Sequence, residues 1–317
     1  MARVNSSFPR SALPAGHKEG NTMMSPLHSA QASPSSAAVI GLDVDGIPGS
    51  APIFSGATDV RPVPRQRFDV MGCRIDRVSP SEAVERISAW AERRESRYVC
   101  MCNAHVTVTT NHDAAFHAAL AQADMVAPDG APVAWMLRRL GATGQKRVSG
   151  PDLMLDYCEH AAATGQSIFL YGTTDQTLEA LQQRLLARWP TLRIAGALAP
   201  PFRPLTAEED AAVVKYINDS GAQTVWVSLG CPKQELWMAA HRGRVKAVML
   251  GVGAAFTFHS GLGRRAPRWM QERGLEWLHR LATEPRRLWR RYLSTNLAFV
   301  VGVARQSLRG FGQGKRH

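Results

Sequence analysis

Short apolar runs alternate with amphipathic stretches along the chain from residue 67 onward. The apolar runs have the length of buried strands and occur at 68–75, 97–102, 124–127, 167–171, 192–197, 224–229 and 247–253. The stretches with helical periodicity begin at Ser79 and continue at 104–121, 132–140, 152–164, 175–189, 206–219 and 233–241. This alternation predicts an α/β fold, with a mostly parallel sheet and helices on both of its faces.

The pattern divides the chain into three segments. Residues 1–66 are rich in Ser, Ala, Pro and Gly and lack periodicity, so we expect a disordered head. Residues 67–263 contain the alternating elements and form the expected catalytic domain, and residues 264–317 form a basic amphipathic appendage. The head contains Asp43-Val44-Asp45, which has the form of a metal-nucleotide motif but arises easily by chance in a disordered segment.

The chain shows no signal for a membrane span or for secretion. No apolar run approaches the ~18–20 residues that a bilayer span needs, and the N-terminus has no apolar signal-peptide region. The five cysteines are an odd number without a CxxC pair, so they predict neither a disulfide framework nor a zinc site. We therefore expect a reduced, cytoplasmic protein.

Positive charge is concentrated in the appendage. The chain has a formal net charge of +12, and residues 264–317 contain thirteen Arg and Lys against three Glu, a net charge of +10. On a helix, four arginines fall within an arc of about 140°, and four apolar or aromatic residues fall on the opposite arc. The arginines are Arg286, Arg287, Arg290 and Arg291, and the opposite residues are Leu288, Trp289, Tyr292 and Leu293.

This arrangement is typical of a helix that lies on an anionic membrane surface, and the same arginines can bind a diphosphate. Two alternatives remain: a solvated basic helix and a nucleic-acid-binding protein with a sequence pI near 10.1. The Trp and Leu residues between the arginines argue against both, because a protein that only contacts phosphates needs no apolar arc.

Glycine and polar residues follow several predicted strands, whose carboxyl ends form one edge of a parallel sheet. The clusters are Asn103-Ala104-His105, Pro128-Asp129-Gly130, Tyr171-Gly172-Thr173, 230–235 and Gly251-Val252-Gly253. Glycine lets backbone N–H groups approach phosphates, and helix N-termini favour anions, so this edge predicts a nucleotide site. The sequence has no GxGxxG after the first strand and no Walker lysine, HExxH or GxSxG motif.

Asp129 is the strongest candidate for a general base. It follows a short apolar strand and precedes a helix, so its side chain should face the cleft, where partial burial raises a carboxyl pKa. The alternative is that Asp129 caps the helix that starts near Pro132. His105 is either a site residue or a satisfied histidine at a helix start, and the sequence identifies no partner for His259.

Several long motifs, in order over residues 68–300, resemble the WecG/TagA/CpsF glycosyltransferase family. They are APDGAPVAW (127–135), RVSGPDL (147–153), FLYG (169–172), GCPKQELW (230–237), GVGAAF (251–256) and the tail RAP…WM…GLEWL…EPRRL (265–288). The resemblance implies a Rossmann-like fold and an inverting transferase. It also implies transfer of a sugar from a UDP donor to a polyprenyl-diphosphate-linked saccharide at the inner face of the cytoplasmic membrane.

The resemblance also assigns roles to residues. It implies Asp129 as the base, no metal and no cofactor, and an appendage that docks on the membrane and completes the site. The expected donor- or acceptor-binding residues are Asn103, His105, Arg147, Gly150, Asp152, Tyr171, Gly172, Gly230, Lys233, Gln234, Glu235, Gly253 and Thr257. The expected diphosphate or membrane contacts are Arg265, Arg268, Arg286, Arg287, Arg290 and Arg291.

Two positions depart from the family pattern. Thr257 stands where many members have Asp, and Met101 stands where some have Thr. A hydroxyl at 257 still binds a sugar hydroxyl but carries no charge, so N-acetylmannosamine, its uronic acid and glucose all remain candidate sugars. A homo-oligomer is left open, and no nucleic-acid partner is expected. A nucleotide-sugar epimerase or an NAD-linked oxidoreductase is a further alternative, disfavoured by the missing GxGxxG.

Overall fold

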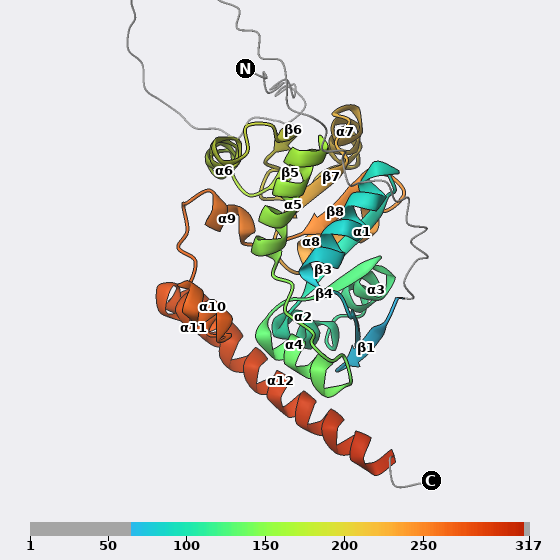
Figure 1. The fold of residues 1–317 in the computed structure, drawn as a ribbon, viewed down its shortest axis with the longest axis vertical. Helices are drawn as coiled ribbons and strands as arrows, with labels where there is room; N and C mark the ends of the chain where they lie inside the picture. The colour runs from blue at the N-terminus through green and yellow to red at the C-terminus, as the bar shows by residue number, and fades with distance from the viewer. Residues whose placement is uncertain (1–64, 314–317) are drawn as a thin grey trace, which may run out of the picture. The chain divides into compact units, whose positions relative to one another are not determined.

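The computed structural model describes residues 65–313 (Figure 1). It contains a six-stranded sheet in the order β4-β3-β8-β7-β5-β6, in which every neighbouring pair is parallel. The strands are β3 (Arg97–Cys102), β4 (Met125–Pro128), β5 (Ser167–Gly172), β6 (Arg193–Leu198), β7 (Thr224–Ser228) and β8 (Val248–Gly251). The predicted α/β fold is therefore confirmed. Most of the predicted head, including Asp43-Val44-Asp45, lies outside the described residues.

Helices cover both faces of this sheet (Figure 1). One layer contains α2 (Ala104–Thr110), α3 (Ala114–Gln122), α4 (Ala131–Arg139), α7 (Ala207–Asp219) and α8 (Lys233–His241). The other contains α1 (Pro80–Glu92), α5 (Gly150–Thr164), α6 (Asp175–Arg188) and α9 (Ala255–His259). In β7, Val225 and Val227 face the first layer and Trp226 faces the second, and all three are fully buried. Burial on both faces explains why the strands are continuous apolar runs in the sequence.

Two predicted elements are divided in the structure. The predicted strand 68–75 is a hairpin of β1 (Arg67–Val70) and β2 (Cys73–Asp76), because Met71 and Gly72 both have positive φ and form its turn. The predicted helix 104–121 is α2 followed by α3. Asp113 separates them, since its side chain accepts a hydrogen bond from the Phe116 amide and caps α3.

The appendage consists of α10 (Arg268–Glu272), α11 (Glu276–Thr283) and α12 (Pro285–Gln313). Within residues 65–313, no helix is long and apolar enough to cross a membrane. The long helix α12 packs against α2 (Figure 1). One side of α12 is buried, through Leu288, Thr295, Phe299 and Val303, and the last two belong to the core of the domain. The side chains of Arg287, Arg290, Arg291, Tyr292 and Leu293 lie outside the described residues.

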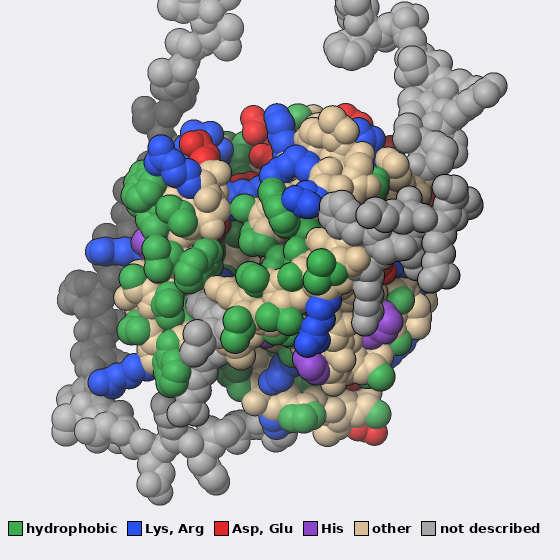
Figure 2. Space-filling model, turned by 90° about the horizontal axis from the view of Figure 1, so that it is seen from below, with side chains coloured by type: hydrophobic (Ala, Val, Ile, Leu, Met, Phe, Trp, Pro, Cys, Tyr) green, Lys and Arg blue, Asp and Glu red, His purple; other side chains and the backbone are tan. Residues whose placement is uncertain are grey.

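The expected exposure of Leu288 is wrong. Leu288 is only 1% exposed and lies on the same side of α12 as the buried Phe299 and Val303. The exposed apolar residues of α12 lie on the other side and include Trp289, Leu297, Val300, Val301 and Leu308. Figure 2 shows the face that α12 crosses, where apolar side chains gather over the middle and Lys and Arg side chains lie among and around them. We call Trp289, Leu297, Val300, Val301 and Leu308 the outer apolar stripe.

Truncating Leu288 should therefore weaken the fold rather than leave it unchanged. We expect Leu288→Ala to lower the free energy of unfolding by about 2–4 kcal/mol, because it removes a buried side chain and leaves a cavity. Urea denaturation followed by circular dichroism measures this change. The matched control is Leu297→Ala, in which a leucine of the same helix is 64% exposed and the loss should be small. Equal effects of the two substitutions would contradict this orientation of α12.

Candidate functional site

The candidate base lies at the carboxyl edge of the sheet. Asn103 follows β3, and Asp129 follows the neighbouring strand β4. The Asp129 amide donates to the Cys102 carbonyl over 2.9 Å, and Asn103 Nδ2 lies 3.4 Å from Asp129 Oδ2. Asn103 Oδ1 accepts from the amides of His105 and Val106 and caps α2. The parallel pairing of β3 and β4 thus places the amide and the carboxylate together.

Asp129 does not cap the next helix. The N-cap of α4 is Gly130, and no side chain forms a cap hydrogen bond there, so the capping alternative is wrong. The pKa of Asp129 is raised to about 6. Burial is the largest cause and the negative charge of Glu276 adds to it, while the Asn103 hydrogen bond and the Arg147 charge oppose the rise. A carboxyl group with this pKa is ionised at neutral pH and still basic enough to accept a proton.

Two arginines and two carboxylates form a closed ring beside Asp129. Arg265 binds Asp152 through two hydrogen bonds of 2.5 and 2.9 Å, and its Nε lies 3.4 Å from Glu276 Oε1. Glu276 Oε2 lies 3.2 Å from Arg147 Nη1, and Arg147 Nη2 lies 3.8 Å from Asp152 Oδ2. The domain supplies Arg147 and Asp152, and the appendage supplies Arg265 and Glu276. We call these four residues the charge ring.

Glu276 is the site residue that the sequence analysis missed. It is the first residue of α11 and one of the three acidic residues in the basic appendage. Its position in the Gly-Leu-Glu-Trp-Leu motif was visible in the sequence. Nothing there indicated that its carboxylate would meet Arg147, which lies 129 residues earlier.

A second group of predicted residues joins the start of α8, with Gln234 and Glu235, to the loop after β8, with Gly253. Gln234 Oε1 accepts a hydrogen bond of 3.1 Å from the Gly253 amide, and Gln234 Nε2 donates to Glu235 Oε1 over 2.8 Å. Both side chains are buried, and burial raises the pKa of Glu235. A Cβ on Gly150 would lie 3.4 Å from the Val252 carbonyl, so the loop packs directly on the start of α5, which carries Asp152. Gln234 and Glu235 therefore hold the loop from within.

Other predicted residues are placed apart from the charge ring. Tyr171 is buried and packs on Trp237, with ring centroids 4.6 Å apart. Gly172 permits close approach of β5 to β7, since a Cβ there would lie 2.4 Å from the Ser228 carbonyl. His105 Nδ1 lies 3.4 Å from Thr295 Oγ1, which connects α2 with α12.

The remaining predicted positions are at turns, at helix ends or on the surface. Gly230 has a φ of 79°, and Lys233, Thr257, Arg268 and Arg286 are exposed. The Arg268 guanidinium lies 3.7 Å from Glu272. His259, for which the sequence identified no partner, lies 2.8 Å from the Pro151 carbonyl through Nε2, and burial lowers its pKa.

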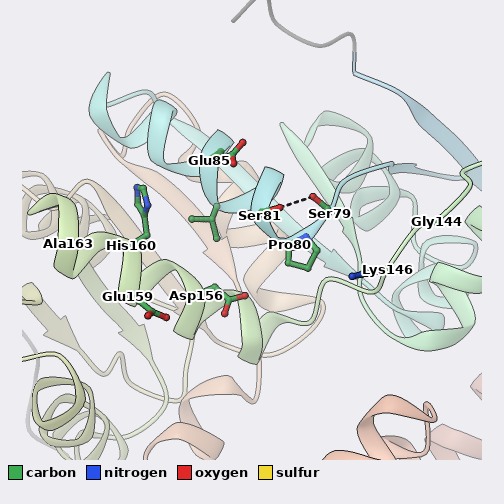
Figure 3. Close-up of a pocket in the computed structure, with 11 residues that line it drawn as sticks. Ser79, Pro80, Ser81, Glu85, Gly144, Lys146, Asp156, Glu159, His160 and Ala163 are labelled. Atoms are coloured by element: carbon green, nitrogen blue, oxygen red, sulfur yellow. Dashed lines mark hydrogen bonds between the residues drawn. The ribbon is translucent and has the colours of Figure 1, made fainter. Parts of the chain in front are cut away.

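A separate pocket of about 730 Å³ lies between α1, α5 and the loop at Gly144–Lys146 (Figure 3). Glu85, Asp156 and Glu159 line it, with Lys146 at its edge. These carboxylates repel a diphosphate, so its chemistry does not match the predicted ligand. No group of three or more His, Cys, Asp or Glu residues in the described part of the chain is arranged to hold a metal ion.

Comparison with known proteins agrees with the sequence motifs. Residues 68–313 match the model of the glycosyl transferase WecG/TagA/CpsF family. A Bacillus subtilis (strain 168) protein named N-acetylglucosaminyldiphosphoundecaprenol N-acetyl-beta-D-mannosaminyltransferase is 30% identical over 217 residues, which cover 66% of this chain and 82% of that protein. A Staphylococcus aureus (strain NCTC 8325) protein of the same name is 28% identical over 228 residues, covering 71% of this chain and 87% of that protein.

Proposed function

Because the chain belongs to the WecG/TagA/CpsF family of glycosyltransferases, we propose that it transfers a sugar from a UDP donor to a polyprenyl-diphosphate-linked saccharide, with inversion at the anomeric carbon. The observation that carries this proposal is the Asp129 carboxylate, with its pKa raised to about 6, beside the two arginines of the charge ring. A base and a cationic group side by side are what this transfer requires.

In the proposed reaction, a hydroxyl oxygen of the acceptor attacks the anomeric carbon of the donor sugar from the face opposite UDP. Asp129 accepts the hydroxyl proton as the new C–O bond forms. The bond between the anomeric carbon and the diphosphate oxygen breaks, and UDP leaves with the bonding electron pair. Arg147 and Arg265 stabilise the negative charge that develops on the diphosphate, because guanidinium groups bind phosphate oxygens in pairs.

Among the candidate sugars we favour N-acetylmannosamine over its uronic acid and glucose. The relatives from B. subtilis and S. aureus are named for N-acetylmannosaminyl transfer to N-acetylglucosaminyl-diphosphoundecaprenol. Thr257 supports an uncharged sugar, because its hydroxyl offers hydrogen bonds but no charge to a bound ligand. We propose N-acetylglucosamine on a polyprenyl diphosphate as the acceptor.

We further propose that the appendage rests on the inner face of the cytoplasmic membrane, where a polyprenyl-linked acceptor is held. The outer apolar stripe of α12 supports this, since its Leu297, Val300 and Leu308 side chains are 64%, 63% and 72% exposed to solvent. The arginines near the start of α12 add attraction to anionic lipids.

Mass spectrometry of the acceptor tests the proposed function. The full-length protein is incubated with a short-chain N-acetylglucosaminyl-diphosphate lipid and one UDP-sugar at a time. The three donors are UDP-N-acetylmannosamine, its uronic acid counterpart and UDP-glucose. We expect the acceptor to gain the mass of one N-acetylmannosamine residue, with release of one UDP. A gain with another sugar corrects the donor, and no gain with any UDP-sugar contradicts the proposal.

Gln234→Ala should weaken UDP binding, because the Gly253 amide and Glu235 lose the partner that holds the loop. A buried hydrogen bond of this kind contributes about 1 kcal/mol, so the Kd should rise about fivefold. Titration calorimetry with UDP measures it. Gln182→Ala is the control, since the hydrogen bond of Gln182 within residues 65–313 is to the Leu178 carbonyl of its own helix. Unchanged UDP affinity in a folded Gln234 variant would place the nucleotide elsewhere.

A further inference from the structure

The carboxylates of the charge ring hold Arg147 and Arg265 in the way that phosphate oxygens would. Asp152 and Glu276 both contact both arginines. In this structure the two cations are therefore neutralised by two protein anions. A diphosphate that binds the same arginines must share them with these carboxylates or displace one of them.

The two carboxylates are not held equally. Asp152 forms a bidentate pair with Arg265 at 2.5 and 2.9 Å. Glu276 makes one contact of 3.4 Å to Arg265 and one of 3.2 Å to Arg147. Bidentate guanidinium–carboxylate pairs are the stronger and more specific ones. An incoming anion therefore displaces Glu276 more easily than Asp152.

Glu276 also lies where a further negative charge is repelled by Asp129. Asp129 is close enough that the charge of Glu276 contributes to raising the Asp129 pKa. A diphosphate between the arginines would add further negative charge beside Asp129 and Glu276, against the Asn103 hydrogen bond and the Arg147 charge that favour the ionised Asp129. Glu276 belongs to the appendage, on the short helix α11, and its side chain remains 21% exposed. It can therefore turn into water without opening the domain core.

We propose that Glu276 is an internal competitor, which occupies Arg147 and Arg265 in the ligand-free enzyme and is displaced when a diphosphate binds. This inference rests on the proposed function, because the diphosphate is that of the donor or of the lipid-linked acceptor. It makes the appendage part of the ligand-free site as well as of the loaded one. Diphosphate binding thereby releases the Glu276 contacts that join α11 to the domain.

The test is a binding experiment with Glu276→Gln in the full-length protein. Gln keeps the size of the side chain and removes its charge, so the arginines become available. We expect the Kd for UDP, for inorganic pyrophosphate or for a short-chain prenyl diphosphate to fall about fivefold, the ratio expected for partly exposed ion pairs. Titration calorimetry with each ligand measures it. A lower Kd for UDP alone identifies the donor as the ligand. A lower Kd for the prenyl diphosphate alone identifies the acceptor as the ligand.

Glu272→Gln is the matched control. Glu272 lies on α10 of the same appendage and its only ion pair among the described residues is with the exposed Arg268, so the substitution changes the net charge equally without touching the ring. Equal tightening in both variants, or no tightening with Glu276→Gln, overturns the proposal, and a structural role for Glu276 would weaken binding instead. If the wild-type protein binds neither UDP nor a prenyl diphosphate, the proposed function itself fails.

Discussion

Replacing Asp129 by Asn should lower turnover by about 10²-fold or more while leaving donor binding nearly unchanged. Asn has the same shape as Asp but cannot accept the proton of the attacking hydroxyl. Its amide still fits beside Asn103 Nδ2, provided that its oxygen occupies the position 3.4 Å away. The measurements are kcat with saturating donor and acceptor and the Kd for the UDP-sugar. Turnover within about threefold of wild type would remove Asp129 from the role of base.

The pH dependence of activity in the wild-type enzyme and in Asp129→Asn gives a second readout. In the wild-type enzyme, kcat/KM should fall as the pH drops below about 6, because the Asp129 carboxylate becomes protonated. The residual activity of Asp129→Asn should lack this step. Asp156→Asn is a suitable control, since Asp156 is another carboxyl with a raised pKa but lines the separate pocket near α1. A profile that keeps its step near pH 6 in Asp129→Asn would assign the step to another group.

The raised pKa of Asp129 also makes the stability of the fold depend on pH. An unfolded Asp has a pKa of about 3.9, and the folded Asp129 has a pKa of about 6. The folded state thus binds the proton more tightly, so this group stabilises the fold below about pH 4 and loses that contribution as the pH rises through 6. Asp129→Asn, which is never charged, should therefore raise the melting temperature at pH 8 relative to wild type, even as it removes activity.

Introducing charge into the outer apolar stripe should release the protein from membranes. Leu297 and Val300 are 64% and 63% exposed on the side of α12 away from the domain. We expect the double variant Leu297→Asp, Val300→Asp to bind phosphatidylglycerol-containing vesicles about 100-fold less tightly, because two apolar side chains no longer enter the interface. Vesicle sedimentation at moderate salt measures the change. Sedimentation equal to wild type would show that the stripe does not contact lipid.

The charge contribution can be measured separately. Reversing Arg286, Arg287, Arg290 and Arg291 to Glu should also weaken vesicle binding, at about 1 kcal/mol for each arginine near the surface. Wild-type binding should weaken as salt rises, since exposed charges are screened. Phe202→Asp is the matched control for the Asp substitutions in the outer apolar stripe, because Phe202 is an exposed apolar residue outside α12. It is 89% exposed on the loop between β6 and α7. Its vesicle binding should equal that of wild type.

Much of the fold was predictable because the sheet is buried on both faces. The runs at 97–102 and 167–171 are apolar throughout, and each coincides with a strand to within one residue. The hairpin turn at Met71–Gly72 was harder, because Met rarely adopts the positive φ that this turn requires. The orientation of α12 was wrong for a different reason. This helix is apolar on two sides, and its sequence does not say which side the domain covers.

The candidate site was predictable where it depends on strand order and not where it depends on tertiary contacts. Residues that follow parallel strands share one edge, which brings Asn103 and Asp129 together. The charge ring joins segments that lie more than a hundred residues apart, so the motif that contains Glu276 was visible in the sequence but its contact with Arg147 was not. The motif that contains Tyr171 indicated a site, yet this side chain packs into the interior. A motif therefore marks both groups that face a ligand and groups that hold the loop beneath it.

The two ends of the described chain are tied together by Gln306, whose side chain bonds to the Met71 amide and the Asp69 carbonyl. Synthesis runs from the N-terminus at about 5–20 residues per second. Gln306 lies 235 residues after Met71, so it is synthesised about 12–47 seconds after the hairpin turn. Throughout that interval a nascent chain has the hairpin but not the helix that carries the outer apolar stripe. The contacts of the hairpin turn with Gln306 therefore form only after the helix that carries the outer apolar stripe has been synthesised.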